Sequence, residues 1–127
     1  MPKDGKRRMV SGGKPSRGMV VLVNLEPVKG HEQGRSRPCL VVQNDVGNRF
    51  STTTIVVPLT DAAHIKVASP IYVLIKKGEG GTAKDSYALC DQIRVVDQQR
   101  FGKVYGTLSA ETMEAIDRAL KISLRLR

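Results

Sequence analysis

Residues 52–60 read TTTIVVPLT and give the clearest strand signal in the chain. β-Branched residues dominate the run, and successive side chains of a strand point to opposite faces of the sheet. The odd-numbered residues from 53 to 59 therefore share one face, and the even-numbered residues from 54 to 60 share the other. The odd-numbered face is the more apolar. We therefore expect it to pack on the core, and we expect Thr60 to emerge on the wetter side where the strand ends.

Further runs of β-branched and apolar residues predict strands on both sides of this one. They cover residues 19–25, 39–43, 71–75, 86–96 and 101–108. Residues 44–51 read as a connection with one helical turn, and residues 28–37 as a long exposed loop. Pro38 restricts the backbone of Arg37 to an extended conformation and can open the strand that follows.

One helix is predicted, at the C-terminus. Ser109 is a suitable N-cap, and an apolar stripe recurs at spacings of three and four residues from Met113 to Leu124. Six short strands and one helix predict a mainly β fold, a small and strongly bent β-barrel with a C-terminal α-helix. Such a barrel has few residues with which to close itself, so we expect a dimer that covers exposed apolar surface.

The chain has 127 residues and a formal net charge of +9, which fits one domain with a polyanionic partner. Residues 1–17 carry six Lys or Arg and one Asp, so more than half of the excess charge lies in a short segment. We predict a flexible basic tail over residues 1–16 and one folded domain over residues 17–127. The tail is either a solubilising extension or an arm that touches nucleic acid, and both readings stay open.

Several classes of protein do not fit this sequence. No apolar run reaches the roughly 18 residues needed to cross a bilayer, and the N-terminus lacks the apolar segment of a secretory signal. Cys39 and Cys90 build neither a disulfide framework nor a metal cluster, so we expect a reduced, cytoplasmic protein. His31 and His64 lie in separate loops, and the Gly-rich residues 78–81 lack the Lys-Ser/Thr of a phosphate-binding loop. We therefore predict no metal and no cofactor.

Polar residues gather where the predicted strands end. Residues 30–38 are dense in hydrogen-bonding side chains, Thr60 and Asp61 end one strand, and residues 91–94 interrupt an otherwise apolar run. Taken singly, each of these is more often a solvated or turn residue than a functional one. A plain RNA-binding module would show aromatic stacking platforms. The aromatic residues are few and scattered along the sequence: Phe50, Tyr72, Tyr87, Phe101 and Tyr105.

An ordered series of motifs spans residues 17–125. It begins with residues 19–27 (MVVLVNLEP), 30–34 (GHEQG), 37–42 (RPCLVV) and 44–51 (NDVGNRFS). It continues with residues 54–60 (TIVVPLT), 84–86 (KDS), 91–94 (DQIR) and 106–109 (GTLS). In order and spacing this series resembles the MazF/PemK family of toxin endoribonucleases.

The resemblance implies a homodimer of SH3-like β-barrels that cuts single-stranded RNA at short sequences without a metal. The 2′-hydroxyl beside the scissile phosphate would be the attacking group. A cognate antitoxin protein would block the RNA groove. The protein implied is thus the toxin of a type II toxin–antitoxin system, an mRNA interferase.

The family's catalytic roles correspond to Arg37 and Thr60, and His31 matches a residue that only some members use. Arg37 offers a permanently charged fork that can grip two phosphate oxygens, and Thr60 can donate a hydrogen bond to a non-bridging oxygen. An imidazole such as that of His31 suits a proton shuttle near neutral pH. Some members place an arginine two residues before Asp91, where this chain has Leu89. Because of this departure, acid–base catalysis must depend on other residues, which supports the assignment of Arg37 and Thr60 as catalytic residues.

We expect the other polar residues of these segments to contact RNA. They are Glu32, Gln33, Arg35, Ser36, Asn44, Arg49, Asp91, Gln92 and Arg94. An alternative stays open, a non-catalytic toxin or binding module on the same barrel that traps a protein such as a topoisomerase or merely holds RNA. A protein trap has no need of Arg37 beside Thr60, and its key residues would be expected in the C-terminal helix.

Overall fold

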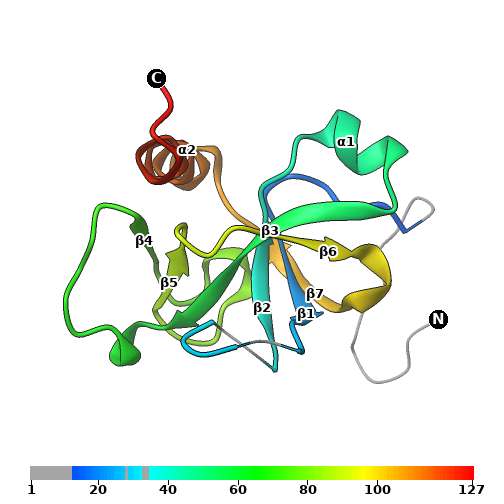
Figure 1. Ribbon diagram of the computed structural model, residues 1–127. Coiled ribbons are helices and arrows are strands. Elements are labelled where there is room, and N and C mark those ends of the chain that lie inside the picture. The colour runs from blue at the N-terminus through cyan, green and yellow to red at the C-terminus, as the bar shows by residue number, and fades with distance from the viewer. Residues whose placement is uncertain (1–12, 28, 33–34) are drawn as a thin grey trace.

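The computed structural model describes residues 13–27, 29–32 and 35–127 of the chain (Figure 1). Its strands are β1 (Met19–Asn24), β2 (Ser36–Val41), β3 (Thr53–Asp61), β4 (Tyr72–Ile75), β5 (Ser86–Leu89), β6 (Arg94–Asp97) and β7 (Phe101–Thr107). Two α-helices, α1 (Asp45–Phe50) and α2 (Ala110–Leu124), accompany the turns η1 (Ala62–His64), η2 (Glu79–Gly81) and η3 (Gln98–Arg100). The predicted mainly β fold with a C-terminal helix is confirmed.

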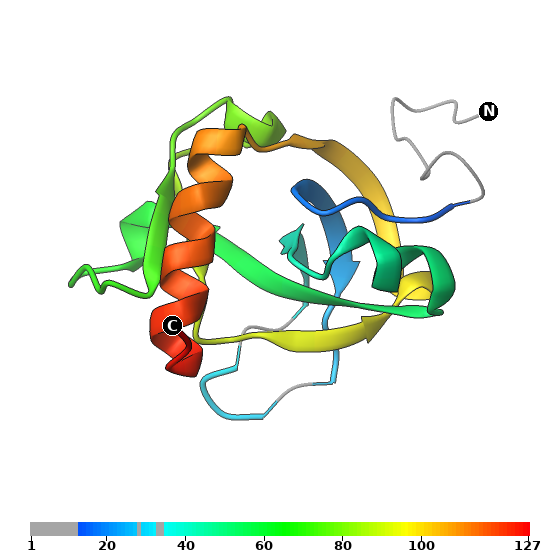
Figure 2. The same cartoon turned by 90° about the horizontal axis from the view of Figure 1, so that it is seen from above.

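The strands form one bent antiparallel sheet. Its hydrogen-bonded path runs β4-β5-β3-β2-β1-β7, and β6 pairs with β3 off this path. Contrary to the prediction of a barrel, β4 and β7 end the path without pairing with each other in the described part of the chain. Turn η2 packs against β7 instead, so closely that a Cβ on Gly106 would lie 2.8 Å from the carbonyl carbon of Gly80. The sheet therefore curls without closing, and α2 lies along one side of it (Figure 2).

Residues 86–96 contain two strands, β5 and β6, rather than the single strand expected. β5 pairs with residues 59–61 of β3, and β6 pairs with residues 53–56. Between the two strands the backbone N–H of Gln92 donates to the carbonyl of Leu89 at 2.9 Å and closes a turn. The polar residues 91–92 leave the ladder at this turn. The next strand, β6, therefore pairs with the earlier residues of β3.

β3 is buried on both of its faces. The first core comprises Val20, Leu40, Val42, Val57, Leu59, Ile75, Ala88, Cys90, Leu108, Ile116 and Ala119. The second core comprises Val21, Val23, Leu25, Cys39, Val41, Val56 and Val96. Thr60 is only 4% exposed, so the expectation that it emerges on a wetter side is wrong. Thr60 shares its face of β3 with Val56 of the second core, and Tyr87 of β5 lies directly beside it.

α2 begins directly after Ser109, the predicted N-cap. The Oγ of Ser109 accepts a hydrogen bond from the N–H of Thr112 at 3.2 Å, and Arg125 ends the helix in a left-handed conformation. Glu79 of η2 accepts hydrogen bonds from the backbone N–H and the Oγ of Ser109 at 3.2 and 3.1 Å. Ile116 faces the first core. These contacts fix α2 on the first-core side of the sheet.

Residues 13–17 lie against the folded domain. The guanidinium of Arg17 forms an ion pair with Asp117 of α2 at 2.6 Å, and its Nε donates to the carbonyl of Val42 at 2.8 Å. The rest of the predicted tail, residues 1–12, lies outside the described residues. The proposed boundary between tail and domain stays a prediction.

A buried asparagine ties α1 to β3. Asn48 is 1% exposed, and its Nδ2 donates to the carbonyl of Gln43 at 3.0 Å. Its Oδ1 accepts from the Oγ1 of Thr54 at 2.5 Å and from the Nε2 of Gln43 at 3.0 Å. The side chain of Asn44 begins the helix by accepting from the N–H of Gly47 at 2.7 Å. Two asparagines four residues apart thus have different structural roles, one as a buried anchor and one as an exposed cap.

We expect Asn48→Ala to lower the free energy of unfolding by at least about 2 kcal/mol, since each buried polar group that loses its partner costs about 1–3 kcal/mol. The matched control is Asn44→Ser, which is exposed and keeps a capping oxygen, and it should cost less than about 0.5 kcal/mol. Urea unfolding followed by circular dichroism measures both. Equal losses for the two variants would contradict the assigned roles.

Candidate active site

The pairing of β2 with β3 brings Arg37 and Thr60 together. Cys39 lies opposite Pro58, and Leu40 lies opposite Val57. The paired residues end at Cys39 and Pro58, and Arg37 and Thr60 each lie two residues beyond this end on their own strand. The Nη1 of Arg37 is 3.5 Å from the carbonyl oxygen of Leu59, to which it donates. The two predicted catalytic residues are therefore neighbours across two strands.

The local sequence explains the orientation of Arg37. Pro38 holds the preceding residue in an extended conformation, so Arg37 continues β2 instead of the loop before it. Arg37 pairs with Val23 of β1. Its alternate neighbour Cys39 belongs to the second core, so Arg37 projects from the same face at the edge of that core. Thr60 projects from this face too, because it alternates with Leu59 of the first core.

Two guanidinium groups act on the buried thiol of Cys39. Burial raises the pKa of Cys39 to about 12, and the positive charges of Arg37 and Arg94 only partly offset this by favouring the thiolate. Arg94 lies in β6 opposite Val56, and its Nη1 donates to the carbonyl of Leu25 at 3.1 Å. Positive charge is therefore gathered at the edge of the second core, where it can attract a phosphate.

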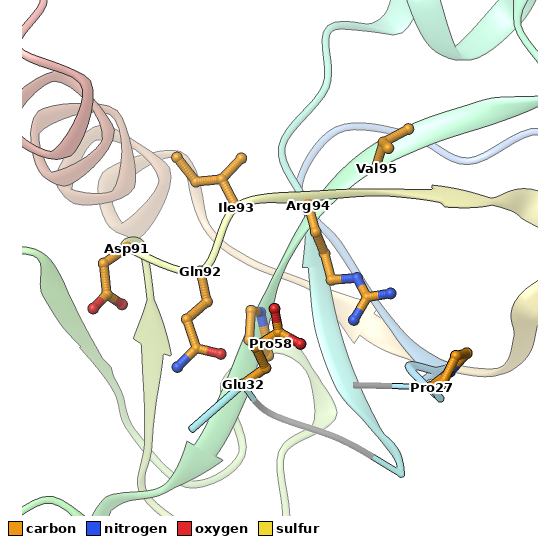
Figure 3. Close-up of a pocket in the computed structure, with 8 residues that line it drawn as sticks. All are labelled: Pro27, Glu32, Pro58, Asp91, Gln92, Ile93, Arg94 and Val95. Carbon is orange, nitrogen blue, oxygen red and sulfur yellow. The ribbon is translucent and has the colours of Figure 1, made fainter. Parts of the chain in front are cut away.

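A pocket of about 630 Å³ opens on this side of β3 (Figure 3). It is lined by Pro27, Glu32, Pro58, Asp91, Gln92, Ile93, Arg94 and Val95. Figure 3 shows the side chains of Gln92 and Arg94 extending to the same side of their segment. Pro58 lies two residues before Thr60 and so on the same face of β3. Carboxylates, an amide and a guanidinium converge here, a mixture of donors and acceptors that can hydrogen-bond to the edges of nucleobases.

The segment before β2 places other predicted residues at the surface. His31 and Glu32 are exposed, and Glu32 accepts a hydrogen bond from the N–H of Lys29 at 2.6 Å. Arg35 has a positive φ of 60°, and its N–H donates to Glu26. Ser36 begins β2. Gln33 lies outside the described residues, so its predicted role has no structural counterpart.

Two of the predicted RNA-binding residues lie away from this site. Asn44 caps α1, and Arg49 is exposed in the last turn of that helix. α1 precedes the first residue of β3, whereas Thr60 is near its end, a separation of roughly 20 Å along the strand. Within one chain the structure does not bring Asn44 or Arg49 to Arg37, and their contact with RNA stays a prediction.

Tyr72 and Tyr87 are neighbours, although they are far apart in the sequence. Their ring centroids are 6.3 Å apart, and Tyr87 lies directly opposite Thr60 in the ladder of β3 and β5. Counting aromatic residues along the sequence therefore missed this pair. The alternation of residues 72–75 and 86–89 assigns each tyrosine to one face of its strand. It shows that the two tyrosines are neighbours only when the register of the two strands is known.

Neither a metal cluster nor a membrane span is found among the residues that the structure describes. Within residues 13–27, 29–32 and 35–127, no three His, Cys, Asp or Glu side chains are grouped as metal ligands. No helix in these ranges is long and apolar enough to cross a membrane.

Comparison with known families decides the identity of this fold. Residues 16–124 match the family described as PemK-like, MazF-like toxin of type II toxin-antitoxin system. The chain belongs to this family. The toxin is 46% identical over 110 residues to Endoribonuclease EndoA of Bacillus subtilis (strain 168), a match that covers 87% of the toxin and 94% of EndoA. It is 44% identical over 110 residues to Endoribonuclease MazF of Staphylococcus epidermidis, covering 87% and 91% of the two chains.

Solved structures share the toxin's fold. An endoribonuclease in complex with its cognate antitoxin from Mycobacterial species has a TM-score of 0.73 and 25% identity, over 89% of the toxin and 97% of that chain. MazF from Deinococcus radiodurans has a TM-score of 0.75 and 24% identity, over 89% of the toxin and 98% of that chain. The resemblance to the MazF/PemK family that the motifs indicate is confirmed.

The cysteines give a test of the site's packing. Burial raises the pKa of Cys39 and of Cys90 to about 12, and the charge of Asp91 adds to the effect at Cys90. A thiol with a raised pKa stays protonated at pH 8, and the thiol form is a poor nucleophile. We expect the folded toxin to resist iodoacetamide at pH 8 and the urea-unfolded chain to react at both positions. Mass spectrometry measures the adducts, and rapid alkylation of folded toxin would show that the second core is open at Cys39.

Proposed function

We propose that the toxin is an endoribonuclease that cleaves single-stranded RNA at specific sequences, with Arg37 and Thr60 acting on the scissile phosphate. The observation that carries the proposal is the contact of the Arg37 guanidinium with the carbonyl of Leu59, the residue before Thr60, beside the pocket at Pro58. A permanent cation next to a hydroxyl donor suits a phosphate whose charge grows during reaction. The relatives named endoribonucleases support the same activity.

The reaction needs a proton acceptor for the 2′-hydroxyl, stabilisation of the charge on the phosphate, and a proton donor for the 5′-oxygen. The 2′-oxygen loses its proton and bonds to the adjacent phosphorus, and the bond from phosphorus to the 5′-oxygen then breaks. The 5′-oxygen takes up a proton, which leaves a 2′,3′-cyclic phosphate and a 5′-hydroxyl. Arg37 would bind the equatorial oxygens while negative charge accumulates, and the Thr60 hydroxyl would donate to one of them. His31, on the exposed loop, is the candidate proton carrier.

The toxin's partners follow from its surface. We propose that it acts in the cytoplasm as a homodimer. The homodimer is supported by large apolar side chains that stay exposed at the end of α2 and just after it. Ile122, Leu124 and Leu126 are 56%, 54% and 60% exposed. An antitoxin protein with an acidic segment would neutralise the cations around Arg37 and exclude RNA. The relative solved with its cognate antitoxin supports such a partner.

Substitution of Arg37 separates catalysis from binding. We expect Arg37→Ala to slow single-turnover cleavage by about 10²–10³-fold, the usual cost of removing one preorganised donor. Affinity for an uncleavable 2′-deoxy substrate should change far less, because the charge that Arg37 meets develops in the transition state. Arg37→Lys should rescue poorly, since an ammonium does not reproduce a bidentate fork. Thr60→Val should show the same pattern more mildly.

Arg49→Ala is the matched control for this experiment. It removes the same charge from an exposed site on α1, so it should leave the saturated cleavage rate unchanged and affect at most binding and its salt dependence. If Arg37→Ala cleaves at the wild-type rate once saturated, Arg37 only binds RNA and the catalytic assignment is wrong.

Metal dependence tests the mechanism independently. Because attack by the 2′-hydroxyl needs only protein donors and a proton carrier, cleavage should persist in excess EDTA. The downstream fragment should carry a 5′-hydroxyl, which polynucleotide kinase labels without prior phosphatase treatment. Complete loss of cleavage in EDTA, restored by a divalent ion, would overturn this mechanism.

A further inference from the structure

The face of the sheet that carries Thr60 continues across β5 and β4. Thr60 lies opposite Tyr87 of β5, and Tyr87 lies opposite Leu74 of β4. Residues directly opposite in an antiparallel pair project from the same face, with Cβ atoms about 4.5–5.5 Å apart. Their alternates Leu59 and Ala88 belong to the first core, which α2 covers. Thr60, Tyr87 and Leu74 therefore project from the face that α2 does not cover.

This face presents an aromatic surface next to the site. Tyr72 lies on it as well, two residues before Leu74. The rings of Tyr72 and Tyr87 are tilted by 52° and their centroids are 6.3 Å apart, so they do not stack face to face. Both tyrosines are partly exposed, and Leu74 is 41% exposed. An edge of apolar and aromatic surface thus begins one strand away from the hydroxyl of Thr60.

The opposite face of β3 carries a charged residue, Asp61, where the strand ends. Asp61 follows Thr60 and alternates to the other face. Its carboxylate accepts from the N–H of Ala63 at 2.9 Å and forms an ion pair with Lys84 at 3.3 Å. The hydrogen bond from Ala63 and the ion pair with Lys84 lower the pKa of Asp61. This carboxylate is therefore held by Ala63 and Lys84 on the face opposite Thr60, and the ion pair with Lys84 offsets its charge.

We propose that Tyr72 and Tyr87 form a stacking platform for a nucleobase adjacent to the scissile phosphate. The proposal rests on the proposed cleavage at Arg37 and Thr60. Single-stranded RNA commonly binds with its backbone along cations and its bases on aromatic rings. Here Arg37 supplies the cation, and Tyr87 supplies a ring across the ladder from Thr60. The platform accepts any base by its π-face, so it positions the RNA, while the pocket with Asp91, Gln92 and Arg94 reads base edges.

The platform is tested by combining oligonucleotides that lack one base with toxin variants that lack the ring of Tyr87. The cleavage site is first mapped by sequencing the 5′ ends of RNA fragments, and an uncleavable 2′-deoxy oligonucleotide is built around it. An abasic residue is then placed at each position next to the scissile phosphate, with wild-type toxin, Tyr87→Leu and Tyr87→Phe. We expect Tyr87→Leu to weaken binding by about 5- to 150-fold, and Tyr87→Phe, which keeps the ring, to stay within about threefold of wild type.

At the RNA position whose base contacts the platform, the loss of the base and the loss of the Tyr87 ring should not be additive in their effects on binding. One abasic substitution should weaken binding to wild-type toxin by a similar factor and add little further loss in Tyr87→Leu. 2-Aminopurine at that position should be quenched by wild-type toxin and less by Tyr87→Leu. Phe50→Leu is the matched control, an aromatic side chain that is 79% exposed on α1, and it should leave binding and quenching unchanged.

The outcomes separate this proposal from the proposed function. If wild-type toxin does not cleave RNA, the endoribonuclease assignment itself fails. If it cleaves, but base and ring removal are additive at every position, the platform is wrong. If Tyr87→Leu instead shifts the sedimentation coefficient toward a monomer and leaves RNA affinity per assembled toxin unchanged, the face binds a second copy of the chain and the platform is again overturned.

Discussion

The register of β2 against β3 determines which side chains of this protein can act on one ligand. Cys39 lies opposite Pro58 at the end of this pairing, and two residues further along each strand the guanidinium of Arg37 donates to the carbonyl of Leu59, next to Thr60. A slip of one residue would turn every side chain of one strand to the other face. Here such a slip would also move apolar residues out of two separate cores. The same packing that stabilises the sheet therefore keeps the guanidinium and the hydroxyl on one face.

Burial of β3 on both faces has a consequence for chemistry. Thr60 is 4% exposed, so most of its surface is in contact with neighbouring residues. A donor that is already oriented costs no reorganisation when charge develops on a phosphate. Arg37 differs, because it is only partly buried and projects beyond the second core. In the proposed mechanism, a neutral donor with little freedom to move therefore lies beside a more accessible cation.

Much of this molecule could be predicted from its sequence. β-Branched alternation located the strands, the Ser109 cap located α2, and the ordered motifs indicated the family and with it Arg37 and Thr60. The second core could not be predicted, because the alternation of residues 52–60 shows two faces but not that the sheet bends around both. The break within residues 86–96 and the pair of Tyr72 with Tyr87 depend on strand register, which the sequence does not specify.

The loop before β2 is attached to the rest of the site by backbone contacts. Arg94 donates to the carbonyl of Leu25, and Arg100 donates to the carbonyls of Asn24 and Glu26. Two guanidinium groups, from β6 and η3, therefore bind backbone carbonyls at the end of β1. Every residue type has such a carbonyl, so these contacts do not depend on the side chains there. The exposed side chains further along the loop, including His31, take no part in these contacts. Substitutions in that part of the loop therefore leave the anchor, and with it the position of the loop's base beside the pocket, unchanged.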